Sequence, residues 1–98
     1  MWIVINEDSV INGNTLTKIY CAKKNYTGSI YKVYADALNT SETIYLHGFE
    51  KEECAQKLIR KLVNYLTGKD NEYPFELKFI SERIIENYEK EKNDTKWL

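Results

Sequence analysis

The spacing of apolar residues changes at Glu50, and this change constrains the fold more than any other feature of the sequence. Before Glu50, β-branched and aromatic residues form short runs separated by turns, which is typical of strands. After Glu50, apolar residues recur every three or four positions and predict an amphipathic helix over about residues 50 to 67. Its apolar stripe comprises Ala55, Leu58, Ile59, Leu62, Val63 and Leu66. Strands followed by helices predict an α+β fold with the helices on one face of a sheet.

The first half of the chain predicts an antiparallel meander of four to five strands. Glycines at positions 13, 28 and 48 supply turns, and the segment "KNYTG" is typical of a hairpin. We expect the strands at about residues 2–5, 10–11, 15–23, 29–37 and 43–47.

The last third of the chain allows two interpretations. Apolar residues alternate, as in a strand, at Tyr73, Phe75, Leu77 and Phe79, whereas Pro74 suits the first position of a helix. One helix over 75–92 would turn Phe75 and Phe79 away from the stripe of Leu77, Ile80, Ile84 and Tyr88. We therefore expect an extended segment to about residue 79, then a helix over about 81–92 with Ser81 as its N-cap. Residues 93–98 are expected to fray.

Length and charge set broad limits. The 98 residues predict one domain, 1–98, and the net charge of −1 indicates no particular partner. Met1 is not followed by the basic segment and long apolar core of a signal peptide. No run approaches the roughly 18 apolar residues that a bilayer crossing needs. We expect a cytoplasmic protein without membrane association, in which Cys21 and Cys54 stay reduced.

The layout of the first two thirds carries one resemblance. The segments "MWIVIN", "YKVYAD" and "IYLHGFEKEECA", the last leading into an amphipathic helix, give a pattern that covers roughly residues 1 to 67. This pattern resembles small uncharacterised bacterial and phage proteins with a strand-rich body, some of which are similar to pleckstrin-homology-like folds. The resemblance rests on layout and transfers no site residues.

The stretch "TIYLHGFEKEECAQKL" groups His47, Cys54 and three glutamates. A zinc site usually needs three or four ligands, and strand alternation is expected to place His47 on the face of the sheet opposite the helix that carries Cys54. The glutamates suit the positive end of the helix. No phosphate-binding glycine pattern or hydrolase motif is present. We therefore expect no catalytic residue, no metal, no cofactor and no enzymatic activity.

Tyrosines and lysines on the strands form the principal candidate binding surface. Lys18 and Lys32 mark the solvent face of two strands, and alternation adds further side chains to it. The predicted surface comprises Lys18, Tyr20, Lys32, Tyr34, Tyr45 and His47. It could bind protein or stack nucleic-acid bases. Alternatively, its tyrosines could only stabilise the sheet or lie beneath the C-terminal helix. Phe75, Phe79 and Trp97 form a second candidate interface.

These features favour a non-enzymatic module that binds another protein or itself. Twelve lysines against two arginines, with ten isoleucines and nine asparagines, are typical of an AT-rich bacterial or phage genome. The resemblance to small bacterial and phage proteins implies a phage or mobile-element accessory protein that modulates or inhibits a host protein. The alternatives are a weak single-stranded nucleic-acid binder, which the charge balance disfavours, and a homodimeric structural protein. The segments "RKLVNYL" and "NYEKEKNDTK" carry charged residues at helical spacing and are interpreted as solvated helix faces.

Overall fold

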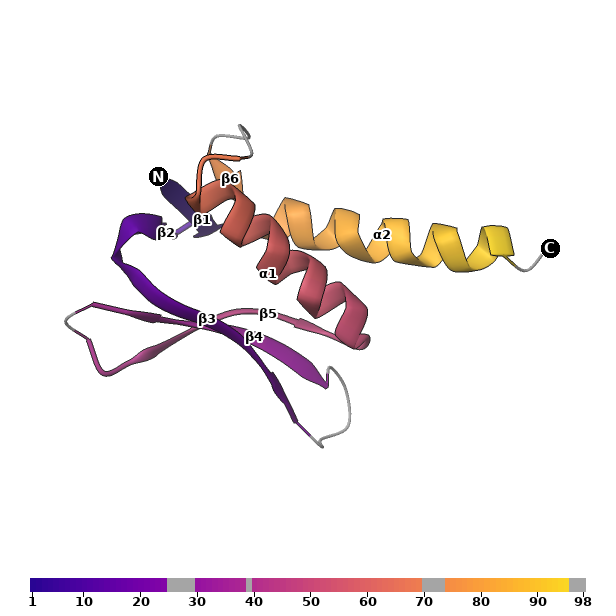
Figure 1. Ribbon diagram of the computed structural model, residues 1–98, viewed down its shortest axis with the longest axis horizontal. Helices are drawn as coiled ribbons and strands as arrows, with labels where there is room; N and C mark the ends of the chain where they lie inside the picture. The colour runs from indigo at the N-terminus through magenta and orange to yellow at the C-terminus, as the bar shows by residue number, and fades with distance from the viewer. Residues whose placement is uncertain (25–29, 39, 70–73, 96–98) are drawn as a thin grey trace.

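The computed structural model describes residues 1–24, 30–38, 40–69 and 74–95, with side chains as far as residue 92. Within these residues the α+β class is confirmed, with six strands in two sheets and two α-helices (Figure 1). The elements in chain order are β1 (Trp2–Asn6), β2 (Ser9–Asn12), a 3₁₀ turn (Gly13–Thr15), β3 (Leu16–Lys23), β4 (Tyr31–Ala37), β5 (Thr43–Phe49), α1 (Glu52–Leu66), β6 (Phe75–Glu76) and α2 (Leu77–Thr95).

The strands form two sheets and not one continuous meander. β3, β4 and β5 make an antiparallel sheet in chain order, whereas β1 lies between β2, which is antiparallel to it, and β6, which is parallel. The 3₁₀ turn separates the sheets at Gly13, whose backbone N–H donates to the Met1 carbonyl at 2.7 Å. A Cβ on Gly13 would collide with the side chain of Leu66, so the turn packs directly against α1.

The C-terminal region differs from the prediction at its helix start. The extended segment is only β6, and α2 begins at Leu77 instead of near Ser81. Phe75 pairs with Ile3 of β1 and is 1% exposed, because its ring packs against Tyr65 with ring centroids 5.2 Å apart. Ser81 is therefore not an N-cap. It lies inside α2, fully buried, with no hydrogen-bond partner for its hydroxyl within the described residues.

The core lies between the two helices and the β3–β4–β5 sheet (Figure 1), and it extends to Ile3 of β1 and Phe75 of β6. α1 buries the predicted stripe residues Ala55, Leu58 and Leu62, and each large buried side chain contributes roughly 1.5–3 kcal/mol. Tyr65 joins this face at 2% exposure, while Val63 is exposed. The Tyr65 hydroxyl accepts from the Trp2 N–H at 3.1 Å and donates to the Trp2 carbonyl at 2.9 Å, which ties α1 to the start of β1.

Candidate functional site

Three tyrosines form a row across the outer face of the β3–β4–β5 sheet. Tyr20 pairs with Tyr34, and Tyr34 pairs with Tyr45, so the three rings come from three adjacent strands. Together with the two adjacent rows of cross-strand neighbours on the same side of the sheet, they form a surface that we call the tyrosine face. It comprises Lys18, Asp36 and Thr43, then Tyr20, Tyr34 and Tyr45, then Ala22, Lys32 and Gly48. The prediction that the tyrosines and the two lysines share one face agrees with this register.

The rings of this row contact one another and the lysines. Tyr20 and Tyr34 are stacked with centroids 5.7 Å apart, and Tyr45 meets Tyr34 edge-on at 5.8 Å. The Nζ of Lys18 lies 4.7 Å from the Tyr20 centroid, and the Nζ of Lys32 lies 5.8 Å from that of Tyr45. Partial burial, and secondarily Tyr34, raise the pKa of Tyr45, so its hydroxyl stays protonated at neutral pH. The face therefore presents hydroxyl donors and ammonium groups on an aromatic base.

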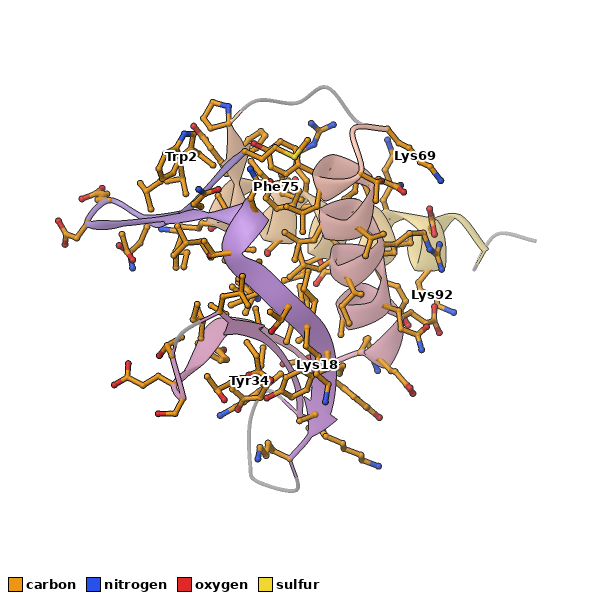
Figure 2. The ribbon with its side chains drawn as sticks, turned by 60° about the vertical axis from the view of Figure 1, so that its left-hand side comes forward. Trp2, Lys18, Tyr34, Lys69, Phe75 and Lys92 are labelled. Carbon is orange, nitrogen blue, oxygen red and sulfur yellow. The ribbon has the colours of Figure 1, made fainter. Side chains whose placement is uncertain are left out.

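Both helices pack on the opposite side of this sheet (Figure 1). Tyr45 remains 50% exposed, while Tyr20 and Tyr34 are half-buried by their neighbours in the row. Lys18 and Tyr34 lie near one another and well apart from Trp2 and Phe75 (Figure 2). The alternative in which the C-terminal helix covers the tyrosines is therefore wrong for the described part of α2. The ring contacts do stabilise the sheet, and they leave the outer surface of the row open to a partner.

His47 does not belong to the tyrosine face, because β5 contains a bulge. Tyr34 pairs with Tyr45, but its neighbour Val33 pairs with His47. Leu46 is therefore an additional residue of β5 that has no partner of its own on β4. The extra residue resets the alternation of side chains. His47 consequently shares the inner face with Val33, which is fully buried. The predicted position of His47 beside Tyr45 is wrong for this reason.

The bulge places His47 in a groove together with Cys54. The groove has a volume of about 400 Å³ and lies between the end of β5, the start of α1 and the C-terminal half of α2. Its lining is His47, Gly48, Phe49, Glu50, Lys51, Cys54, Ile85, Tyr88 and Glu89. The two residues that alternation predicted to lie on opposite sides of the sheet therefore line one hollow.

The chemistry of this groove is limited. The Nδ1–H of His47 donates to the Gly48 carbonyl at 2.8 Å, which leaves Nε2 as the acceptor in the neutral ring. Burial raises the pKa of the Cys54 thiol, an effect that Glu53 reinforces and Lys57 opposes. A protonated, buried thiol is a poor nucleophile. Within the described residues, no hydrogen bond joins His47 to Cys54, and no group of three or more His, Cys, Asp or Glu could hold a metal.

The second predicted interface does not form as a unit. Phe75 belongs to the core, Phe79 is 54% exposed on α2, and Trp97 lies outside the described residues. Phe75 is buried by its pairing with β1, whereas the helical period exposes Phe79, since it points away from the buried positions Leu77 and Ile80. Phe79 instead lines a shallow hollow of about 280 Å³ beside β1.

A cationic groove between α1 and α2 was not predicted from the sequence. Two adjoining hollows there share Lys61, Ile84 and Asn87 and together include both arginines of the chain, Arg60 and Arg83. The segment "RKLVNYL" was interpreted as an ordinary solvated face, although its charged residues, Arg60 and Lys61, are both basic. A linear sequence does not show which part of α2 lies beside it. The available signal was that Lys57, Arg60 and Lys61 lie in a segment, residues 54–69, without an acidic residue.

Comparison with known proteins adds no relative. No protein-family model matches the chain, and neither the curated proteins nor the solved structures include a significant match. Neither helix, over its described residues, is long and apolar enough to cross a membrane. The resemblance to pleckstrin-homology-like proteins stays a prediction.

Proposed function

We propose that this domain is a non-enzymatic module that binds another protein through the tyrosine face. The observation that carries the proposal is the row of Tyr20, Tyr34 and Tyr45 on a sheet face that neither helix covers. Tyrosine is enriched in protein interfaces because it combines a large apolar ring with a hydroxyl.

The contacts within the row favour binding at low entropic cost. Each ring touches a neighbouring ring, and two rings also carry a lysine ammonium group, so their conformations are restricted before a partner arrives. Side chains that are already ordered lose less entropy on association.

The size of the surface favours a transient complex. With strands about 4.8 Å apart and side chains on one face about 7 Å apart along a strand, the nine-residue grid measures roughly 10 by 14 Å. A stable interface buries about 800 Å² on each partner, which is several times that footprint. The partner therefore contacts surrounding residues as well, or binds weakly and exchanges quickly.

Single-stranded nucleic acid is the runner-up ligand for the same face. Lysines beside exposed tyrosines are the groups that stack bases and neutralise phosphates. Two features favour protein instead. Tyr20 and Tyr34 are stacked on one another and so offer less free ring surface, and Asp36 in the adjoining row repels phosphate.

The proposed setting is the cytoplasm, with the domain acting as a phage or mobile-element accessory protein that modulates or inhibits a host protein. The lysine-rich, isoleucine-rich composition supports this setting. A homodimer through the same face is a further possibility, and light scattering distinguishes it from a monomer of 11.6 kDa.

The test uses affinity capture from host extract, identification of the captured protein, and calorimetric titration of that purified protein. The test variant changes Tyr20, Tyr34 and Tyr45 to Ser, and the control variant changes the exposed Lys69 and Lys90 to Ser. We expect the tyrosine variant to lose binding while its circular dichroism spectrum is retained and the control binds normally. Unchanged binding by a folded tyrosine variant contradicts the proposal.

A second arm addresses nucleic acid and loss of fold. Binding of oligothymidylate to the wild type, with an affinity that falls steeply between about 50 and 200 mM salt, would favour the runner-up. The single Tyr45→Ser variant serves if the triple variant unfolds, since Tyr45 is the most exposed of the three.

A further inference from the structure

Four cationic side chains converge on the groove between α1 and α2. Lys57, Arg60 and Lys61 come from α1 and Arg83 comes from α2. The lining is completed by the amides of Asn64 and Asn87 and by Ile80 and Ile84 at the base. No carboxylate belongs to this lining among the described residues, although the chain as a whole carries a net charge of −1. Charge is therefore segregated on this side of the molecule.

The cations of the groove are only weakly neutralised by the protein. Lys57 meets Glu91 at 3.9 Å at one end of the groove, and both side chains are exposed, so this pair contributes little. Arg60 and Lys61 make no ion pair with any described residue. The guanidinium of Arg83 lies 5.6 Å from the Phe79 ring centroid, a contact that leaves its N–H groups available.

The dimensions of the groove suit a short segment of chain. Lys57 and Asn64 are seven residues apart on α1 and thus about 10 Å apart along the helix axis. The larger of the two hollows has a volume of about 350 Å³, which is sufficient for a few side chains of a peptide. The asparagine amides supply neutral donors between the charged groups.

We propose that the α1–α2 groove is a docking surface for an acidic segment of a protein partner. Charge complementarity carries the proposal, because arginine presents paired N–H donors that match the two oxygens of a carboxylate. An acidic peptide fits better than single-stranded nucleic acid, because the described lining of the groove includes no aromatic ring on which a base could stack. The groove is formed by the helices and not by the tyrosine face, so this inference does not rest on the proposed function.

The experiment measures binding of a fluorescein-labelled oligoglutamate peptide to the full chain by fluorescence anisotropy at low salt. The test variant is Arg60→Ala with Arg83→Ala. The matched control is Lys69→Ala with Lys90→Ala, which removes the same charge from exposed positions outside the groove. Alanine preserves helix propensity, and thermal melting verifies the fold of each variant.

We expect the arginine variant to bind the peptide about tenfold more weakly than the wild type, and the lysine control to bind like the wild type. The triple tyrosine-to-serine variant should also bind oligoglutamate like the wild type, which separates this proposal from the preceding one. Three results would overturn the inference: no binding at low salt, equal weakening in the two double variants, or tighter binding of an oligothymidylate of equal charge.

Discussion

Replacing Tyr65 by Phe removes one hydroxyl group and leaves the ring in place. This hydroxyl forms two hydrogen bonds, one from the Trp2 N–H at 3.1 Å and one to the Trp2 carbonyl at 2.9 Å. Tyr65 is 2% exposed, so little water can replace the lost partner. A net contribution of about 1 kcal/mol for each hydrogen bond predicts a loss of about 2 kcal/mol in the free energy of unfolding.

Urea denaturation monitored by circular dichroism measures this loss directly. For a domain of this size, 2 kcal/mol corresponds to a fall in melting temperature of about 8–16 °C. The matched control is Tyr45→Phe, because the Tyr45 hydroxyl is exposed and makes no hydrogen bond with a described residue. We expect the control to stay within about 0.5 kcal/mol of the wild type. A Tyr65→Phe loss no larger than that of the control would refute the proposed link between α1 and β1.

Two further perturbations test buried groups. Ser81→Ala removes a fully buried hydroxyl without a hydrogen-bond partner in the described residues, so it should leave stability unchanged or raise it by up to about 1 kcal/mol in the same urea assay; a loss above about 1 kcal/mol would reveal a partner for the hydroxyl. Burial raises the pKa of the Cys54 thiol above its ordinary 9.0, so the unfolded chain releases this proton more readily, and stability should fall as pH rises past about 9. Cys54→Ala should make the free energy of unfolding, measured by urea titration at a series of pH values, fall less steeply with pH. An unchanged slope would assign the pH dependence to other groups, such as Cys21 or Tyr45, whose pKa values are also raised.

The candidate site was predictable where local alternation holds. Lys18 and Tyr20 on β3, and Lys32 and Tyr34 on β4, lie on the face that a period of two assigns to them. His47 was not predictable from the same rule, since one additional residue in β5 moves it to the inner face. A bulge leaves no strong mark in a single sequence, because the residues around it keep ordinary strand composition.

The C-terminal region shows a second limit. The alternation of Phe75, Leu77 and Phe79 is compatible with a strand, yet the chain leaves the extended conformation after Glu76. Phe75 pairs with β1, and the helix that follows buries Leu77, Ile80 and Ile84 on one face. This arrangement places more apolar side chains in the core than a longer strand would. Tertiary packing here overrides a local pattern.

The sequence by itself determined the α+β class, the existence of α1 and the gathering of three tyrosines on one sheet face. These features depend on periodicities of two and of three to four residues, which the covalent geometry of the backbone imposes on every chain. Only the tertiary structure decided that the strands divide into two sheets, that His47 and Cys54 line one groove, and that Arg60 and Arg83 line adjoining hollows between the helices. Those outcomes depend on contacts between residues far apart in the chain, and such contacts are selected by how the whole core packs.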